Sequence, residues 1–193
     1  MPGAKRDLPV LAFKSQPAWE AWLASQPAQS KGLWLKLAKK SSGISSVSRA
    51  DALDTALCHG WIDGQLDRFD DDFWLIRYTP RQSTSKWSEK NRTRALQLVE
   101  LKRMRPACRK QIERAKQDGR WDAAYASQRS IQIPDDLRAA LAKNKKARTF
   151  FEALDSHNRY AILYRLHDAK KAETRATRLT KTVESLREGK RTR

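Results

Sequence analysis

Apolar residues recur at two different periods in the first part of the chain. Trp19, Trp22 and Leu23 stand at i, i+3 and i+4, which predicts a helix over residues 18–25. Residues 32–39 instead place leucine at every second position, a pattern typical of a strand. The opening of the chain therefore indicates a helix followed by a strand.

A second helix and a hairpin follow. Ser48 is placed as the N-cap of a helix that Gly60 terminates. Residues 62–69 and 73–79 predict two strands that pair as a hairpin, and the run 44–47 is interpreted as a short return strand. Together these segments predict a small antiparallel sheet of about three to five strands, packed by helices.

The rest of the chain is helical by the same criterion. Helices are predicted over residues 88–104, 106–119, 134–143, 145–154, 158–167 and 172–188. Residues 126–132 show no periodicity and are interpreted as a linker. The sequence thus predicts an α+β fold, with an N-terminal domain over residues 1–126 and a basic helical C-terminal module over residues 127–193.

The charge of the chain adds a candidate partner. Its 40 basic and 22 acidic side chains give a net charge of +18, and residues 91–193 carry 27 basic against 12 acidic side chains. Such a field attracts polyanions, for example nucleic acid or an anionic surface, although it also serves solubility alone. The basic side chains assigned to a polyanion site lie in or just before the last predicted helix: Lys170, Lys171, Arg175, Arg178 and Lys181.

Cysteine content and the length of apolar runs indicate the compartment. The only two cysteines, Cys58 and Cys108, exclude a disulfide framework. The longest strongly apolar run, Phe73–Ile76, is far shorter than a membrane span, and no signal-peptide segment is recognisable near the N-terminus. We expect a cytoplasmic protein with free thiols and no transmembrane span.

No motif identifies a reaction. The sequence contains no glycine-rich phosphate loop, no nucleophile elbow and no cysteines and histidines at zinc spacing. Asp70–Asp72 is interpreted as a solvated hairpin tip rather than a cation site. We therefore expect no metal and no cofactor, and binding rather than catalysis.

The segment from residue 61 to residue 94 carries the candidate ligand site. Arginines, tryptophans and the start of the predicted 88–104 helix would together form a cleft for a small anion such as phosphate or a carboxylate. In the alternative interpretation these residues are structural: the tryptophans fill the core, Asp63 pairs with an arginine and Ser88 only caps the helix. The residues assigned to the cleft are Trp61, Asp63, Arg77, Arg81, Trp87, Ser88, Asn91 and Arg94.

Several blocks of sequence resemble a bacterial protein family. They are Cys58–Gly64, Arg77–Arg81, Ser85–Ser88, Asp118–Trp121 and Pro134–Leu137. The chain resembles the YdeI/OmpD-associated proteins over about residues 17–190, and its C-terminal part resembles their OmdA-type module. His59 and Thr177 depart from the pattern, which favours an aromatic and a basic residue at these positions.

The resemblance implies a role in the bacterial stress response. Proteins of this family are linked to protection against bacteriocins and cationic antimicrobial peptides, and to association with an outer-membrane porin. The resemblance implies no catalytic residues. A strongly basic protein repels cationic peptides, so direct capture of such peptides is not expected.

Three function hypotheses follow. The favoured one is a stress or defence protein that acts by binding. The second is nucleic-acid binding through the basic helices of residues 140–193, and the third is an enzyme acting on a small anionic substrate in the 61–94 cleft. The enzyme hypothesis requires Arg77, Arg81 and Asn91 to converge on one pocket.

Overall fold

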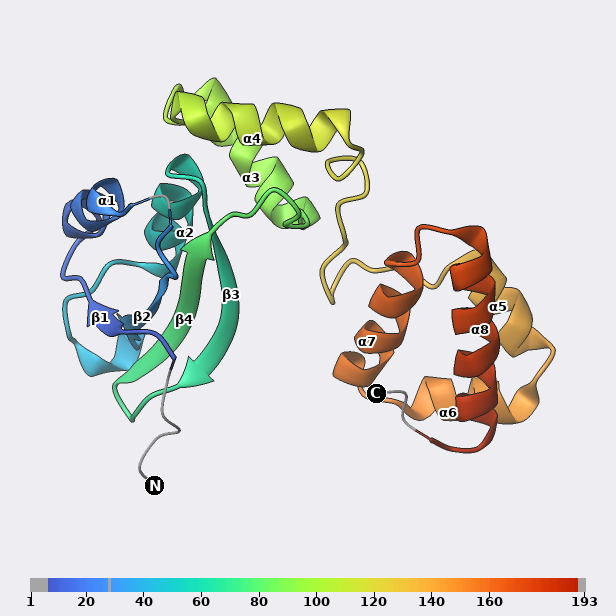
Figure 1. Ribbon diagram of the computed structural model, residues 1–193. Helices are drawn as coiled ribbons and strands as arrows, with labels where there is room; N and C mark the ends of the chain where they lie inside the picture. Colours follow the sequence, from blue (N-terminus) through green and yellow to red (C-terminus); the bar gives the residue numbers. More distant parts are fainter. Residues whose placement is uncertain (1–6, 28, 191–193) are drawn as a thin grey trace. The chain divides into compact units, whose positions relative to one another are not determined.

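The computed structural model describes residues 7–27 and 29–190. These residues divide into two compact units, whose helices and strands are shown in Figure 1. The first unit consists of the described residues up to Lys86 together with Asn91–Asp122. The second consists of Trp87–Lys90 together with the described residues from Ala123 onward. The predicted α+β class is confirmed.

A four-stranded sheet forms the centre of the first unit. Its strands are β1 (Val10–Ala12), β2 (Leu33–Ala38), β3 (Trp61–Arg68) and β4 (Phe73–Pro80), in the order β1-β2-β4-β3. β3 and β4 form the predicted hairpin, and β2 also pairs antiparallel with β4. β1 pairs parallel to β2, so the sheet is mixed rather than wholly antiparallel. The pattern did not reveal β1 because a three-residue strand is too short to show a period.

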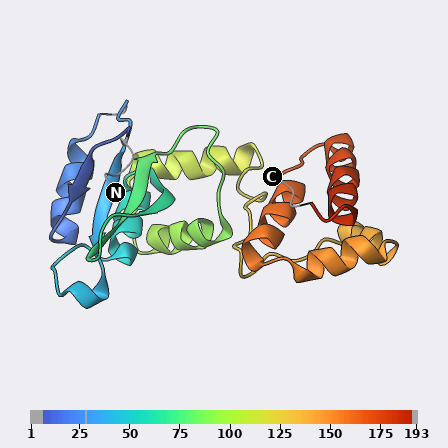
Figure 2. The same cartoon turned by 90° about the horizontal axis from the view of Figure 1, so that it is seen from below.

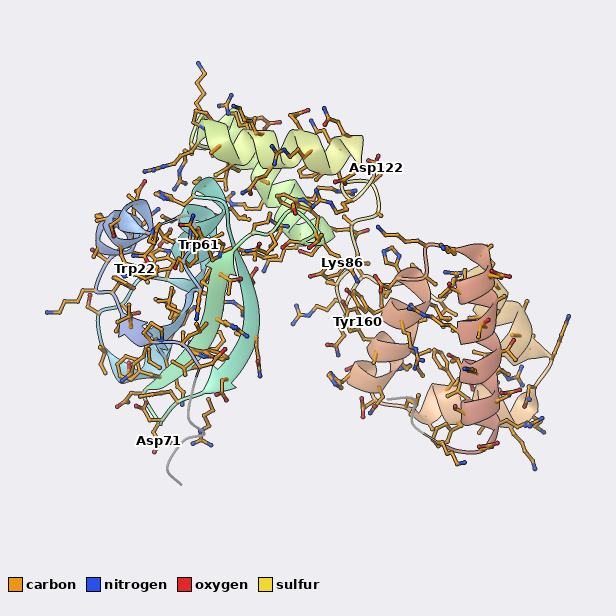
Figure 3. All side chains as sticks on the ribbon, viewed as in Figure 1. Trp22, Trp61, Asp71, Lys86, Asp122 and Tyr160 are labelled. Atoms are coloured by element: carbon orange, nitrogen blue, oxygen red, sulfur yellow. The ribbon has the colours of Figure 1, made fainter. Side chains whose placement is uncertain are left out.

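Two helices, α1 (Gln16–Ser25) and α2 (Arg49–Cys58), pack against one face of the sheet in the main core. Alternate side chains of β2 and β4, among them Leu35 and Tyr78, belong to this core, because successive strand residues point to opposite faces. Trp22 of α1 and Trp61 of β3 lie together here, with ring centroids 5.6 Å apart (Figure 3). The predicted N-cap of α2 is also present, since the Asp51 N–H donates to the Ser48 hydroxyl at 3.1 Å.

Residues 44–47 do not form the predicted return strand. They run irregularly from the short 3-10 helix η1 (Lys40–Ser42) towards α2. The Val47 N–H donates to the carbonyl of Phe13 at 2.9 Å, outside the four strands of the sheet. The apolar Val47 in this run therefore marks a buried loop residue and not a strand.

The helices α3 (Glu89–Glu100) and α4 (Pro106–Gln117) lie next to each other beyond the end of β4 (Figures 1 and 2). α3 ends at Glu100 and not at residue 104, because Lys102 adopts a left-handed backbone with φ of 56°. α4 follows the prediction, and Gly119 beyond it has φ of 76°. The tight turn at Gly119 redirects the chain just before Arg120.

The second unit is helical, as the pattern predicted. Its helices are α5 (Asp135–Ala142), α6 (Lys145–Ala153), α7 (Ser156–His167) and α8 (Ala172–Arg187). Their apolar faces form one core that includes Leu137, Phe151, Leu166 and Leu186. Trp87–Lys90 join this unit because Tyr125 exchanges backbone hydrogen bonds with the segment: its N–H donates to Trp87 at 3.0 Å, and its carbonyl accepts from Glu89 at 2.9 Å.

Candidate anion-binding cavity

A small cavity of about 140 Å³ lies in the first unit, just past the end of β4. Its wall combines the segment after β4, one face of α4 and the turn that follows α4. The lining residues are Arg81, Gln82, Ser83, Gln111, Arg114 and Arg120. Half of them are arginines, and none of these six described residues is an Asp or a Glu. We call this site the arginine cavity.

Gly60 sets the position of two cavity residues. It follows α2 with φ of 77°, a backbone conformation that glycine adopts without strain. Its carbonyl accepts a hydrogen bond of 2.8 Å from the Arg81 N–H. A Cβ atom on Gly60 would lie 3.2 Å from the side-chain amide of Gln111, so any other residue here would push Gln111 back by a few tenths of an ångström. The glycine predicted to end α2 therefore also shapes the cavity wall.

Arg81 and Arg120 both bind the backbone of the loop that follows β4. Nη1 of Arg81 donates to the Lys86 carbonyl at 3.0 Å, and Nη1 of Arg120 donates to the Ser85 carbonyl at 2.9 Å. Because the two acceptors are consecutive, both guanidinium groups are brought to one stretch of backbone. Arg120 is also fixed by Asp118, whose carboxylate accepts from Nη2 at 2.7 Å.

The electrostatics of the arginine cavity favour an anion. Arginine stays protonated in proteins, so all three side chains are charged. Arg81 is 7% exposed and the side chain of Arg120 is 13% exposed, so water screens these two charges weakly. Asp118 offsets part of the charge of Arg120, whereas Arg114 lies exposed on α4. The wall thus keeps a positive charge and planar N–H groups suited to phosphate or carboxylate oxygens.

The size of the arginine cavity limits the ligand. Sites for drug-sized molecules usually measure about 300–1,000 Å³. A cavity of about 140 Å³ instead suits a group of a few heavy atoms, such as a phosphate, a sulfate or a small carboxylate.

The predicted 61–94 cleft is not formed as a single site. Of its assigned residues, only Arg81 lines the arginine cavity. Arg77 lies on the sheet face opposite the main core and pairs with Asp7 at 3.2 Å. Asn91 is buried and donates to Asp63 at 3.0 Å, which ties the start of α3 to β3. Arg77, Arg81 and Asn91 therefore do not converge, and the enzyme hypothesis loses the arrangement that it required.

The other residues assigned to the cleft have structural positions. Trp61 is 5% exposed in the main core, and Trp87 is 3% exposed in the second unit. Ser88 pairs with Tyr125 through an isolated parallel bridge. Arg94 donates through Nε to the buried Asp54 at 2.6 Å and through Nη2 to its other oxygen, which joins α3 to α2. For these residues the structural interpretation describes the contacts better than the ligand interpretation does.

Two of the five residues assigned to polyanion binding are engaged within the second unit. Arg175 donates to both carboxylate oxygens of Asp136, at 2.7 and 2.9 Å, and to the Leu166 carbonyl. Arg178 donates to the Arg165 carbonyl at 2.7 Å. The other three, Lys170, Lys171 and Lys181, are exposed. The basic surface along α8 is therefore smaller than the sequence suggested.

Sequence reasoning missed the other five lining residues of the arginine cavity, which are Gln82, Ser83, Gln111, Arg114 and Arg120. A signal existed for Arg120, because it follows Gly119 in the block Asp118–Trp121 and the glycine predicts a turn there. Nothing in the sequence distinguishes Arg114 from the other basic residues of α4, since its role depends on which segment lies opposite it.

The two cysteines are free and buried. They lie close in space, because the Cys108 thiol donates to the Cys58 carbonyl at 2.9 Å. Burial raises the pKa of Cys108 to about 11 and also raises the pKa of Cys58, so both thiols stay protonated at neutral pH. In the described part of the chain, His, Cys, Asp and Glu form no group of three or more that could hold a metal ion. Among the described helices, none has the length and apolar character needed to cross a membrane.

These observations define a class: an α+β unit with an arginine-lined cavity, followed by a helical module. Residues 11–111 match the family described as "Domain of unknown function (DUF8412)", and residues 130–189 match the OmdA family, described as "Bacteriocin-protection, YdeI or OmpD-Associated". The chain belongs to the DUF8412 family, whose match covers more than half of it, and carries an OmdA domain in its second unit. Searches of curated proteins and of solved structures find no match.

The OmdA match confirms the resemblance of the C-terminal part to YdeI/OmpD-associated proteins, whereas most of the N-terminal blocks fall in the DUF8412 match. The block Pro134–Leu137 lies in the OmdA match. The blocks from Cys58 to Ser88 lie in the DUF8412 match, and Asp118–Trp121 lies between the two matches. Arg81 and Gln82, with Gln111, thus belong to the DUF8412 part of the chain, and Arg120 to the segment that follows it.

Proposed function

We propose that this protein is a bacterial stress protein that binds a small oxyanion in the arginine cavity, and that this binding supports protection against bacteriocins or antimicrobial peptides. The observation that carries the proposal is that three arginines line one small cavity whose six lining residues include no acid. The protective role is suggested by the description of the OmdA family. Binding is favoured over catalysis because the carboxylate beside Arg120, that of Asp118, is already paired with that arginine and so is not placed as a general base.

The binding step is tested with inorganic phosphate, and with sulfate and acetate as related probes. Calorimetric titration at low salt measures affinity for the full chain and for Arg114→Gln, a variant chosen because Arg114 is exposed and its loss leaves the fold intact. We expect Arg114→Gln to weaken binding by about tenfold or more, since a charge-assisted hydrogen bond contributes about 1.5–3 kcal/mol. Arg105→Gln removes the same charge from an exposed site at the start of α4 and should bind as the parent does. No binding at millimolar anion, or equal losses in both variants, contradicts the proposal.

The protective role is tested in cells. A bacterial strain that lacks the gene is complemented with the parent, Arg114→Gln or Arg105→Gln, and the inhibitory concentrations of a bacteriocin and a cationic peptide are measured. We expect the parent and Arg105→Gln to restore resistance and Arg114→Gln to fail. Unchanged sensitivity on deletion of the gene removes the protective role, and full rescue by Arg114→Gln separates that role from the arginine cavity.

A further inference from the structure

A second and larger cavity, of about 480 Å³, lies in the first unit on the side of η1 and the start of α2. Its apolar wall includes Leu37 of β2 and Trp74 of β4. Ile44 and Val47, from the segment between η1 and α2, also line it. We call it the tryptophan cavity. Its volume falls in the range of about 300–1,000 Å³ that is usual for sites binding small organic molecules.

The apolar wall of the tryptophan cavity has a buried part and an exposed part. Leu37 is 2% exposed and Val47 is 4% exposed, so they form a fixed floor within the main core. Ile44, in contrast, is 45% exposed, so its apolar side chain is open to a ligand in the cavity. Gly43 also lines the cavity, and a Cβ atom built there meets nothing within 4 Å. The cavity is thus an open apolar hollow rather than a packing gap.

The charged groups around the tryptophan cavity are basic. Lys39, Lys40 and Arg49 line it, and its described lining residues include no Asp or Glu. Lys39 is already engaged, because its Nζ donates to the carbonyls of Asp70 and Asp71 at 2.9 and 2.8 Å. Arg49 remains at the cavity, with its guanidinium carbon 5.2 Å from the centre of the Trp74 ring. The positive group therefore lies over the indole ring at the cavity.

We propose that the tryptophan cavity binds an aromatic carboxylate. The aromatic ring packs on the exposed Ile44 side chain and the half-buried Trp74 indole, where apolar burial and ring contacts both favour it. The carboxylate pairs with the Arg49 guanidinium, which offers two N–H groups in one plane. A rigid planar ligand loses little conformational freedom on binding, which suits an open hollow better than a flexible chain does. This site is independent of the oxyanion binding proposed for the arginine cavity.

The test uses 2-naphthoate as the probe and 2-naphthamide as its neutral counterpart. The chain has seven tryptophans, and the indole N–H signal of Trp74 is assigned as the one that disappears in Trp74→Phe. We expect 2-naphthoate to shift the Trp74 signal saturably and to bind about tenfold more tightly than 2-naphthamide. A missing shift at millimolar probe, or equal affinity for the two compounds, overturns the proposal.

Variants distinguish the site from non-specific binding. Arg49→Gln should lower affinity for 2-naphthoate to that for 2-naphthamide, and Ile44→Ser, an exposed position that tolerates change, should weaken both probes. Arg68→Gln is the charge-matched control, since the Arg68 side chain is 77% exposed and lies outside the cavity. Arg114→Gln should leave 2-naphthoate binding intact, and Arg49→Gln should leave phosphate binding intact. Equal losses in Arg49→Gln and Arg68→Gln would mean that 2-naphthoate responds only to overall charge.

Discussion

Gly60 meets two requirements, a left-handed backbone and a close contact with its neighbours. Its φ of 77° favours glycine, and its Cα faces Gln111 and Cys108 so closely that a Cβ atom would lie 3.2 Å from each. Gly43 shares only the first requirement, with φ of 67° and open space around it. A comparison of Gly60 with Gly43 therefore measures the effect of the contact with Gln111 and Cys108 separately from that of the backbone conformation.

We expect Gly60→Ala to lower the free energy of unfolding by more than Gly43→Ala. The left-handed backbone alone costs alanine about 1 kcal/mol, and the crowding at Gly60 adds about 1–3 kcal/mol. Urea unfolding of the two variants measures the difference. Gly60→Ala should also weaken phosphate binding, because its methyl group displaces Gln111, whereas Gly43→Ala should not. Equal destabilisation would show that Gln111 moves aside without cost.

His59 gives the first unit a dependence on pH. Burial is the main cause that lowers its pKa from 6.5, the charge of Arg105 lowers it further, and Glu20 at 3.5 Å opposes the shift only in part. The unfolded chain thus takes up a proton more readily than the folded chain, so the free energy of unfolding is highest above about pH 6.5 and falls as the pH falls below it. We expect His59→Phe to lose less stability than the parent between pH 7.5 and pH 5.5 in urea unfolding. Parallel losses would show that His59 is not the group responsible.

Ion pairs join elements that lie far apart in the sequence. Asp54 of α2 holds Arg94 of α3, and Asp136 at the start of α5 holds Arg175 of α8. Each carboxylate stands in a segment predicted as a helix, and neither partner was predicted, because spacing shows the period of an element but not which elements pack together. Arg94 and Arg175, both predicted to bind ligands, instead position helices.

The pair of Asp136 and Arg175 should make the second unit sensitive to acid. Hydrogen bonding to Arg175 is the main cause that lowers the pKa of Asp136 below its usual 3.8. The stabilisation is therefore complete above about pH 4 and is lost as the pH falls through the lowered pKa. We expect Asp136→Asn to destabilise α5–α8 by about 1 kcal/mol at pH 7, since the pair is partly exposed, and to differ little from the parent near pH 2. Amide signals of α7 during urea unfolding report the change.

Asp135→Asn is the matched control for this experiment. Asp135 precedes Asp136 in the same first turn, but its side chain is fully exposed and lies 3.8 Å from Arg138. Its substitution should leave the unfolding curve indistinguishable from that of the parent. A similar loss in both variants would assign the effect to the dipole of α5 rather than to Arg175.

Local patterns predicted most of the elements but only one residue of the arginine cavity. The apolar pattern of the helices and of the hairpin repeats over many residues. β1, in contrast, has three residues and depends on its parallel partner β2. Arg81 could be predicted because it directly follows a strand that ends in proline. The alternation of β4 already placed Arg77 on the face opposite Tyr78, so the pattern itself separated Arg77 from the core side. Arg114 and Arg120 required knowledge of how α4 packs beyond β4.

At the scale of the whole molecule, the net charge of +18 remains the strongest reason to expect polyanion binding. The structure does not concentrate that charge on α8. Arg175 and Arg178 are engaged within the second unit, and Lys181 lies about 15 Å along the helix from Lys171 at 1.5 Å per residue. The charge therefore acts as a diffuse field over many exposed side chains.

A diffuse field makes a specific prediction for duplex DNA. The triple variant Lys170→Gln, Lys171→Gln, Lys181→Gln and the triple variant Lys14→Gln, Lys31→Gln, Lys102→Gln both lower the net charge by three, and all six side chains are exposed. We expect both to weaken binding alike, and to lower the slope of log affinity against log salt by similar amounts, because each lost phosphate contact contributes about 0.9 to that slope. A loss confined to the first variant would restore a defined surface on α8. No binding at about 50 mM salt would remove nucleic acid as a partner, since several phosphate contacts must produce measurable affinity there.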